Sequence, residues 1–472
     1  MKVKISKSFR KSQALVFWQS NTNLKKQLNS SQEKFLRKNL KNKKELTTID
    51  LAGNFVFILS VKKQKDIYLE WEQYRKLASQ VYNQINSEQL KSIHIDAKGV
   101  DVELIKVFLE ALLLSSYSFT KYHSDDKKNK NYLEEISVNS SLNQDALNEI
   151  NEIYEAVAFS RNLVNEPLSF LTAEQLGEEI KKSAKQYGYS AEILGKKKIE
   201  SLKMGGLLAV NRGSFNPPTF SILEWKPQSA KNKKPFVIVG KGVVFDTGGL
   251  SLKPTAGSMD EMKSDMAGAA AVIGSMQLIA ANKLNIHVIA LVPATENRPG
   301  NNAYAPQDII EMHDGTKVEV LNTDAEGRMI LADALSYAKQ FEPELVIDLA
   351  TLTGAAHAAI GPYGIVSMGN AANRYKSKLA ISGERVFERL VEFPFWEEYG
   401  ELIKSDIADI KNLGGPVGGA ITAGKFLEHF TDYPYIHLDI AGPAYIASKD
   451  AYRTKGGTGV GVRLLYNFFK NY

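Results

Sequence analysis

Five nearly continuous runs of apolar residues in the second half of the chain constrain its fold more than any other feature. Runs of this kind are typical of strands that are buried on both faces of a sheet. They occupy residues 236–240 (FVIVG), 286–292 (IHVIALV), 318–321 (VEVL), 345–350 (LVIDLA) and 435–440 (YIHLDI). Helical patterns at 266–281 and 329–341 fall between them. The sequence therefore predicts an α/β domain with a mixed sheet sandwiched by helices.

The first part of the chain shows a weaker α/β pattern. Short β-like runs and helical stretches alternate at 15–18, 55–59, 74–85, 93–95 and 102–114. The polar stretch 123–131 predicts a loop, and a helical period over 143–165 predicts a connecting helix. A chain of 472 residues is expected to form two or more domains. We therefore expect an N-terminal α/β domain at 1–150 and a larger α/β domain at 151–472.

The chain contains no cysteine, which excludes disulfides, thiolate nucleophiles and cysteine-based zinc sites. Its N-terminus has early positive charge but neither an apolar core segment nor a cleavage site of small residues, so it does not resemble a secretory signal. No window approaches the roughly 18 uninterrupted apolar residues of a membrane span. We expect a soluble, cytoplasmic protein with no membrane association.

Positive charge is concentrated at the start of the chain. The first 44 residues hold thirteen lysines and arginines against one acid, Glu33, within a net charge of +6. A basic stretch can contact nucleic acid or another anionic surface. Because no nucleic-acid motif accompanies this charge, we favour a solvated face of a small domain, with nucleic-acid binding as the minor alternative.

Charged residues follow the first of the buried strands, in the segment 239–254 (VGKGVVFDTGGLSLKP). This segment carries Lys241, Asp246 and Lys253, with a Gly-Gly pair that allows tight backbone paths. The segment 259–272 (MDEMKSDMAGAAAV) adds Asp265 just before a helix of small residues. Ligands of such sheets bind at the carboxyl ends of strands. These residues are therefore candidates for a functional site.

A third charged segment, NTDAEGR, follows the run at 318–321. In an extended segment, Asp324 and Glu326 point to one side and Arg328 continues the row. Four carboxylates that converge from strand ends repel one another strongly unless cations lie between them. Oxygen ligands without cysteine or histidine favour Mn²⁺, Mg²⁺ or Zn²⁺, and two ions roughly 3.5–4 Å apart can activate a bridging water. Lys253 is then suited to stabilise a developing oxyanion.

Three segments resemble the signature segments of the leucyl aminopeptidase family, also called cytosol aminopeptidases or M17 metallopeptidases. They are 239–254, 259–272 and 322–335 (NTDAEGRMILADAL). Weaker similarity covers SRNLVNEP (160–167), DLATLTGA (348–355), SDIADIKNLGG (405–415) and HLDIAG (437–442). Residues 1–150 carry no recognisable motif, as expected of a family in which this domain varies. The resemblance implies a catalytic peptidase domain at 151–472 and a variable N-terminal domain that regulates or shapes the oligomer.

The resemblance implies a site for two divalent metal ions, Zn²⁺ or Mn²⁺, with Mg²⁺ as a third option. One ion would be held by Lys241, Asp246, Asp265 and Glu326. The other would be held by Asp246, Asp324 and Glu326, so that Asp246 and Glu326 bridge the pair. Lys241 would have to bind as the neutral amine.

The resemblance also implies catalytic and substrate-binding residues. Lys253 resembles the lysine that stabilises the tetrahedral intermediate, and Arg328 resembles the arginine that holds a bicarbonate ion as general base. The pocket for the first residue of the substrate would involve Met262, Thr351, Leu352, Gly354 and Ala441. The implied reaction is hydrolysis of an N-terminal Leu, Met or similar residue from peptides with a free α-amine, in a homohexamer.

One departure from the family pattern and two rival interpretations remain. Eleven residues separate Lys253 from Asp265, one more than we expect of well-known members, although every ligand is present. One rival is a scaffold whose basic N-terminal domain binds DNA, and the complete ligand set argues against it. The other is a metallohydrolase of phosphate esters, whose sites often carry histidine. No histidine lies in the core motifs here, and we interpret His357 and His437, the nearest to family segments, as structural.

Overall fold

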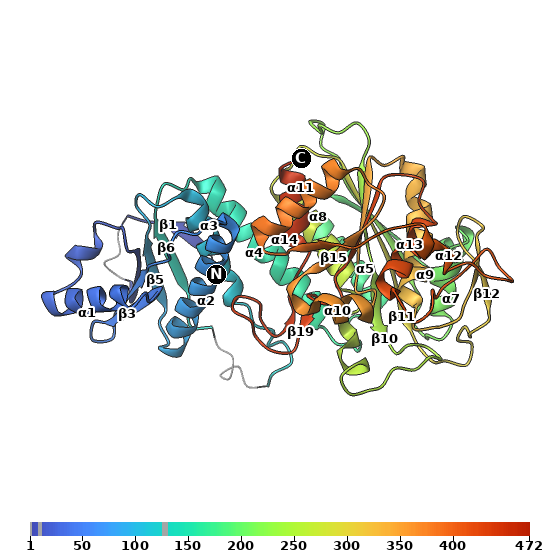
Figure 1. Cartoon of the computed structure of the whole chain (residues 1–472), viewed down its shortest axis with the longest axis horizontal. Coiled ribbons are helices and arrows are strands. Elements are labelled where there is room, and N and C mark those ends of the chain that lie inside the picture. The colour runs from blue at the N-terminus through green and yellow to red at the C-terminus, as the bar shows by residue number, and fades with distance from the viewer. Residues whose placement is uncertain (1, 8–11, 125–130) are drawn as a thin grey trace. The chain divides into compact units, whose positions relative to one another are not determined.

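The computed structural model describes residues 2–7, 12–124 and 131–472. The chain divides into two compact units (Figure 1). The first comprises Met1–Glu155 together with Ser448–Lys455, and the second comprises Ala156–Ala447 together with Gly456–Tyr472. Parts of the basic N-terminal stretch, and most of the loop predicted at 123–131, lie outside the described residues.

A six-stranded sheet forms the centre of the first unit, in the order β1-β6-β5-β2-β4-β3. Neighbouring strands pair in parallel, except for the antiparallel pair β3 and β4. The strands are β1 (Val3–Ile5), β2 (Ala14–Trp18), β3 (Leu46–Asp50), β4 (Phe55–Leu59), β5 (Ser92–Asp96) and β6 (Glu135–Asn139). The helices are η1 (Leu24–Lys26), α1 (Ser30–Lys41), α2 (Ile67–Ser87), α3 (Val102–Ser115) and α4 (Gln144–Asn165), which continues into the second unit.

A nine-stranded mixed sheet forms the centre of the second unit, in the order β16-β15-β18-β14-β9-β11-β8-β7, with β10 paired to β11. Its strands are β7 (Ser190–Leu194), β8 (Thr219–Trp225), β9 (Phe236–Gly240), β10 (Gly242–Asp246), β11 (Val288–Asn297), β14 (Leu345–Ala350), β15 (Ile365–Met368), β16 (Leu390–Glu392) and β18 (Tyr435–Asp439). Two small sheets consist of β12 (Ile309–Glu311), β13 (Lys317–Glu319) and β17 (Ile410–Lys411), and of β19 (Tyr445–Ile446) and β20 (Gly456–Gly457).

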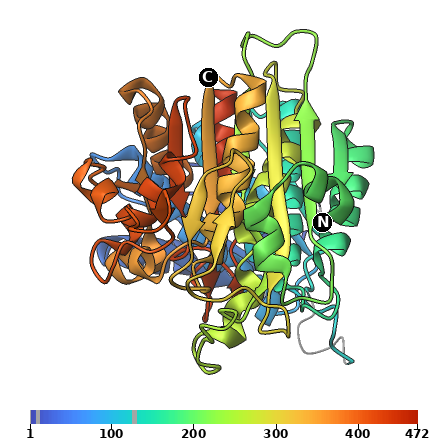
Figure 2. The same cartoon turned by 90° about the vertical axis from the view of Figure 1, so that its right-hand side faces the viewer.

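Helices pack around this sheet (Figure 2). They are α5 (Ala173–Tyr187), α6 (Lys196–Ser201), α7 (Gly205–Asn211), η2 (Met259–Ser264), α8 (Ala267–Ala281), α9 (Glu326–Ala338), η3 (Lys339–Phe341), α10 (Gly354–Ile360), η4 (Gly361–Tyr363), α11 (Asn373–Val386), α12 (Glu398–Glu401), α13 (Gly419–Glu428) and α14 (Val462–Lys470).

Alternation along β9 shows how the helices cover both faces of the sheet. The ring of Phe236 packs edge-on against Phe468 and Phe469 of α14, with centroids 6.4 and 5.5 Å away. Val237 and Val239 belong instead to a core cluster that contains residues of α7, α9 and α13. Successive residues of a strand point to opposite faces, so α14 and α9 lie on opposite sides of the sheet. The predicted α/β fold, with a mixed sheet between helices, is confirmed.

Several predictions for single elements are wrong in detail. The run at 318–321 is not a strand of the main sheet, because β13 pairs with β12 and β17 in a separate sheet. The helix expected to start at residue 329 begins at Glu326, and its last turn is the 3₁₀ helix η3. The segment 239–254, in which no strand after β9 was predicted, contains β10, which pairs in parallel with β11. By contrast, β9 and β14 have the predicted bounds.

One helical segment, Met259–Ala281, is long and apolar enough to cross a membrane by length and composition alone. Its most apolar window is 94% buried inside the protein. The segment contains α8, whose residues from Ala267 to Ala280 are all buried. This burial makes it a core helix of the second unit.

Candidate metal centre

Three carboxylates converge where elements of the second unit meet at one end of the sheet. Asp246 is the last residue of β10, Asp265 directly follows η2, and Glu326 is the first residue of α9. One oxygen from each lies within 4.8 Å of the other two, and all three side chains are buried. The structure therefore brings together three of the four acids that the sequence predicted as metal ligands.

Lys241, which follows β9, lies inside this group and is 3% exposed. Its Nζ lies 2.8 Å from Oδ1 of Asp265 and 2.9 Å from Oε1 of Glu326. It also donates to the main-chain oxygen of Thr351 at 2.8 Å. A Cβ on Gly327 would lie 2.5 Å from Cε of Lys241. A larger residue in place of the glycine of the NTDAEGR motif would therefore have to displace the side chain of Lys241.

Lys253 connects the fourth predicted acid to the group. Its Nζ lies 3.0 Å from Oδ2 of Asp246 and 2.6 Å from Oδ1 of Asp324. Asp324 lies in the turn before α9, whereas Glu326 and Arg328 lie on the first turn of that helix. The prediction that these three residues form one row of an extended segment is therefore wrong, although both acids reach the site.

Negative charge in this group exceeds what its lysines neutralise. Burial, together with Glu326, raises the pKa of Asp246 to about 7. Burial also raises the pKa of Asp265 well above its ordinary value, despite the opposing effect of a lysine, and it raises the pKa of Asp324. Burial acts in the same direction on Glu326, but the two lysines outweigh it and lower the pKa of that carboxyl. Three of the four acids thus attract a cation, either a proton or a metal.

The donor set fits divalent cations. Oδ2 of Asp265 is buried and has no hydrogen-bond partner among the described residues. Leaving a carboxylate oxygen buried without a partner is unfavourable. Carboxylate oxygens are ligands of Mg²⁺, Mn²⁺ and Zn²⁺, and a neutral lysine amine offers a nitrogen. No histidine belongs to the group in the part of the chain that the structure describes.

Arg328 is a second buried cation beside the carboxylates, with 6% of its surface exposed. Its Nη1 donates to the main-chain oxygen of Asn412 at 2.8 Å, and its Nε has no partner within the described ranges. Burial lowers the pKa of its guanidinium to about 10, although Glu326 and Asp439 act in the opposite direction. A buried guanidinium with an unused donor is suited to bind an anion.

The residues predicted for the substrate pocket begin beside the carboxylates. Oγ1 of Thr351 donates to Oδ1 of Asp265 at 2.7 Å. Met262 lies in η2, where its main-chain oxygen accepts from the N–H of Asp265 at 3.3 Å. Gly354 is the exposed first residue of α10, three residues after Thr351. The structure thus places Thr351 and Met262 directly against one predicted ligand, and Gly354 on the helix that follows.

Two buried polar residues of this region were not predicted from the sequence. Asp439, the last residue of β18, accepts the main-chain N–H groups of Leu352 and Ala441 at 3.2 and 3.1 Å. Asn297, the last residue of β11, donates through Nδ2 to Oδ1 of Asp246 at 2.8 Å. Both are polar residues that end an apolar strand. Charged residues at the end of an apolar run also singled out the segment after β9. The same pattern could have identified Asp439 and Asn297.

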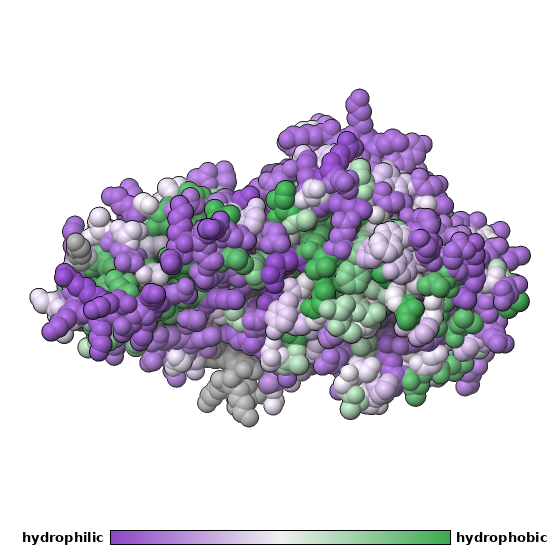
Figure 3. All heavy atoms as spheres, viewed as in Figure 1, coloured by the Kyte–Doolittle hydropathy of each residue, from purple (hydrophilic) through white to green (hydrophobic). Residues whose placement is uncertain are grey.

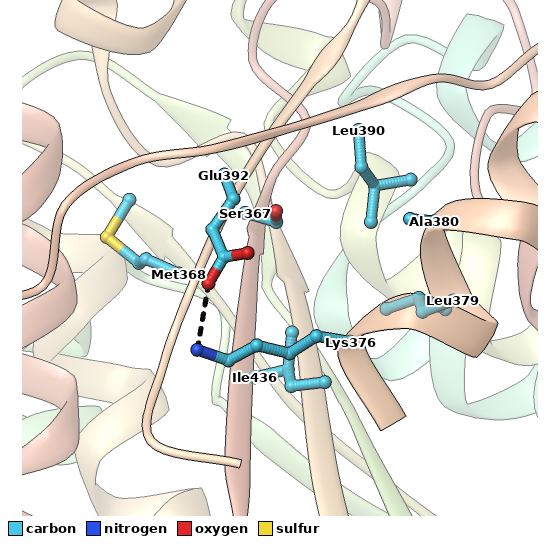
Figure 4. A pocket seen from close by; sticks show the side chains of 8 residues that line it. All are labelled: Ser367, Met368, Lys376, Leu379, Ala380, Leu390, Glu392 and Ile436. Atoms are coloured by element: carbon cyan, nitrogen blue, oxygen red, sulfur yellow. Dashed lines mark hydrogen bonds and ion pairs between the residues drawn. The ribbon is translucent and has the colours of Figure 1, made fainter. Parts of the chain in front are cut away.

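A cavity of about 50 Å³ lies elsewhere in the second unit (Figure 4). It is lined by Ser367, Met368, Lys376, Leu379, Ala380, Leu390, Glu392 and Ile436. Its two charged groups neutralise each other, because Nζ of Lys376 lies 2.9 Å from Oε1 of Glu392. Since β15 runs antiparallel to β18, the ends of β15 and β16 lie opposite the end of the sheet that carries the carboxylates. This cavity contains none of the predicted site residues.

The model of the cytosol aminopeptidase family, catalytic domain, matches residues 158–466. A probable cytosol aminopeptidase from Chlorobium phaeobacteroides is 43% identical over 402 residues, which cover 82% of this chain and 79% of the relative. A probable cytosol aminopeptidase from Geotalea uraniireducens is 43% identical over 395 residues, with coverage of 82% and 79%.

Solved structures agree with this assignment over almost the whole chain. A mutant of tomato leucine aminopeptidase has a TM-score of 0.86 and 28% identity, covering 100% of this chain and 96% of its own. The bottromycin maturation enzyme BotP in complex with Mn has a TM-score of 0.85 and 28% identity, with coverage of 97% and 98%. The chain therefore belongs to the cytosol aminopeptidase family and is a metal-dependent aminopeptidase that acts on peptides.

Proposed function

We propose that this aminopeptidase uses two divalent metal ions to remove the N-terminal residue from peptides with a free α-amine, with Leu, Met and similar residues preferred. The observation that carries the proposal is the buried convergence of Asp246, Asp265 and Glu326, with oxygens within 4.8 Å of one another. Carboxylates at this separation repel unless cations lie between them. The lysines beside them oppose this repulsion only in part, and burial keeps the pKa values of Asp246 and Asp265 raised.

Five side chains would hold the ions, either Zn²⁺ or Mn²⁺, with Mg²⁺ as a third option. Lys241, Asp246, Asp265 and Glu326 would hold one, and Asp246, Asp324 and Glu326 the other. Ions held there would lower the pKa of a bound water and polarise the scissile carbonyl. Lys241 has to lose a proton to serve as a ligand, so loading of the site is expected to improve as the pH rises.

Lys253 would donate to the oxyanion that develops on the substrate carbonyl. Burial lowers the pKa of its ammonium, but Asp246, Glu326 and Asp324 outweigh burial and raise it, so the group stays charged. Its side chain is 14% exposed, in contrast to the 3% of Lys241. A fixed cation next to a developing negative charge stabilises the transition state more than the ground state.

Arg328 would hold a bicarbonate ion that serves as general base. The support is its burial without an ion pair in the described part of the chain, together with an Nε that lacks a partner. Bicarbonate offers oxygens that match a guanidinium in charge and spacing. No histidine lies in the carboxylate group as described to serve as the base instead.

The first side chain of the substrate would lie near Met262, Thr351, Leu352, Gly354 and Ala441. We further propose a cytoplasmic homohexamer in which the first unit shapes the assembly. The assembly is supported by apolar residues on the surface of the protein, coloured green in Figure 3. Large apolar side chains of the second unit that are more than 60% exposed include Leu252, Trp396, Ile407 and Val417. Exposed apolar side chains of this size are available for contacts with other chains.

The test is hydrolysis of leucine-p-nitroanilide by protein that has been stripped with a chelator and then reloaded with Mn²⁺, Zn²⁺ or Mg²⁺. We expect activity to be lost on chelation and restored by at least one ion, with two ions bound per chain. If no ion restores hydrolysis of this substrate or of short Leu- and Met-peptides, the proposal is wrong. Restored activity with one ion per chain would contradict the two-metal mechanism.

A further inference from the structure

Asp439 is a buried carboxylate whose two oxygens each have defined partners. It ends β18 and is 1% exposed. Oδ1 accepts the main-chain N–H groups of Leu352 and Ala441 at 3.2 and 3.1 Å. Oδ2 accepts from the hydroxyl of Thr353 at 2.7 Å. One side chain therefore joins the loop after β14 to the turn after β18, two strands that pair in parallel.

The loop after β14 is part of the candidate site. Its first residue, Thr351, donates through Oγ1 to Asp265 at 2.7 Å and accepts from Nζ of Lys241 at 2.8 Å through its main-chain oxygen. Its third residue, Thr353, is the N-cap of α10 and accepts from the N–H of Ala356 at 3.0 Å. The path of this short loop is therefore fixed at one end by the carboxylate group and at the other end by Asp439.

A carboxylate suits this position better than a neutral side chain. Three donors require acceptors, and the two oxygens of Asp439 accept all three. An asparagine would present an NH₂ group to at least one donor, which would leave buried polar groups without partners. Titratable groups that interact electrostatically with Asp439 include His437 on its own strand and Arg328 on α9. Asp439 thus contacts the pocket loop and interacts electrostatically with the predicted anion-binding arginine, and it is not itself a predicted ligand.

We propose that Asp439 is a positioning residue that fixes Leu352, Thr353 and Ala441 and thereby sets the shape of the pocket for the first side chain of the substrate. This inference rests on the proposed function, because the proposed function assigns Leu352 and Ala441 to the pocket. An apolar pocket distinguishes side chains that differ by a few methylene groups only when its walls are held in place. Asp439 would act on selectivity through these three residues without touching the substrate.

The main test compares leucine- and alanine-p-nitroanilide as substrates of wild type, Asp439→Asn and Asp333→Asn. Asp333 is the matched control, since it is a fully buried carboxylate of the same unit that accepts main-chain N–H groups of Leu207 and His313, away from the pocket loop. In Asp439→Asn we expect the ratio of the two kcat/KM values to fall about 10-fold, with two metal ions still bound. Asp333→Asn should keep the wild-type ratio. An unchanged ratio in Asp439→Asn, or an equal loss in Asp333→Asn, would overturn the proposal.

Thr353 provides a second pair of variants in case Asp439→Asn fails to fold. Thr353→Ser retains the hydroxyl that donates to Asp439 and should keep the wild-type ratio, whereas Thr353→Val should lower it. Loss of selectivity in Thr353→Ser to the same extent as in Thr353→Val would contradict the role of this hydrogen bond.

Hydrogen exchange separates this inference from the proposed function. In Asp439→Ala, peptides that contain Leu352 and Ala441 should exchange faster than in wild type, because their N–H groups lose their shared acceptor, Oδ1 of Asp439. Unchanged exchange at both segments would overturn the positioning role even in an active enzyme. If wild type hydrolyses neither substrate, the proposed function fails, and faster exchange at these segments would still support the positioning role.

Discussion

Both units place buried polar side chains at the ends of strands, yet the two sets differ in how their charge is balanced. In the first unit, Asp96 ends β5 and accepts from the side-chain amides of Asn21, Asn23 and Asn139 at 3.1, 2.9 and 3.3 Å. One carboxylate is thus surrounded by neutral donors. In the second unit, several carboxylates face one another, and Oδ2 of Asp265 lacks a partner among the described residues.

Two buried arginines, one from each unit, show a similar contrast. Arg75 of the first unit is 2% exposed and forms an ion pair with Glu72, with 3.4 Å between Nη1 and Oε2. Arg328 of the second unit is 6% exposed and donates to the main-chain oxygen of Asn412, without an ion pair in the described ranges. The end of a strand offers a place for ligands in both units. The second unit differs because it contains buried charge that its own side chains do not balance, as expected of a site that binds a further ion.

The largest expected effect follows from removing a bridging carboxylate. Asp246→Ala and Glu326→Ala should each lower kcat/KM for leucine-p-nitroanilide by about 10³-fold or more, because each removes a proposed ligand of both ions. Asp96→Ala is the control in the first unit, and it should keep kcat/KM within about threefold of wild type. Near-native rates in Asp246→Ala or Glu326→Ala, with folding confirmed by circular dichroism, would refute the assignment of the bridging ligands.

A smaller effect on activity is expected from substitution of Arg328, with Arg75 as the comparison in the first unit. Arg328→Met should lower kcat by about 10²-fold and abolish any stimulation by added bicarbonate, because the proposed base loses its anchor. Arg75→Met leaves Glu72 buried without its ion pair and should lower the free energy of unfolding instead. Rates measured with and without bicarbonate test both variants. Bicarbonate stimulation that persists in Arg328→Met would contradict its role.

The pH dependence of stability should also separate metal-free from metal-loaded protein. The pKa of Asp246 is raised from 3.8 to about 7, so the folded metal-free protein holds this proton more tightly than the unfolded chain. Its contribution to stability is therefore lost as the pH rises from about 4 to about 7. Burial raises the pKa of Asp333 to about 7 as well, but this carboxyl is not a predicted ligand, so its contribution should persist when metal is bound.

Melting temperatures at pH 5 and pH 8 provide the measurement. Chelated protein should lose more stability between these values than Mn²⁺-loaded protein, and Asp246→Asn should reduce the loss in the chelated form. If chelated wild type and chelated Asp246→Asn show the same pH dependence, the electrostatic account of the carboxylate group is wrong.

The smallest effect on activity is expected from a substitution in the first unit. Asp96→Asn should leave aminopeptidase activity unchanged and lower the free energy of unfolding by about 1–3 kcal/mol, because one oxygen acceptor for the surrounding amides is lost. Urea denaturation and the leucine-p-nitroanilide assay would test this expectation. A loss of activity without a loss of stability would mean that the polar cluster around Asp96 has a functional role that its balanced hydrogen bonds do not suggest.

The sequence predicted the parts of the fold that depend on local pattern. β9 and β14 have the predicted bounds because each is nearly continuously apolar and therefore fits a strand that is covered on both faces. The start of α9 was missed because Ala325, at its N-cap, makes no side-chain capping bond, and acids with a glycine give little periodicity. The run at 318–321 was assigned to the wrong sheet because apolar patterning does not specify a strand's partners.

The sequence predicted which side chains gather at the candidate site, but it did not predict the hydrogen bonds that hold them in place. Lys241, Asp246, Asp265 and Glu326 lie together as the motifs suggested. Asp439 was missed because its bonds to Leu352 and Thr353 join residues 87 and 86 positions apart. Likewise, no local pattern indicated that Ser448–Lys455 joins the first unit, where the hydroxyl of Tyr452 donates to Glu72 at 3.0 Å.

The most direct test of the central claim is a crystal structure of Mn²⁺-loaded protein with an anomalous difference map at the manganese edge. Two peaks per chain are predicted, both in contact with Asp246 and Glu326, and one of them also in contact with Lys241 and Asp265. A map with no peak among these carboxylates, or with a single peak that Asp246 and Glu326 do not share with a second ion, would contradict the account.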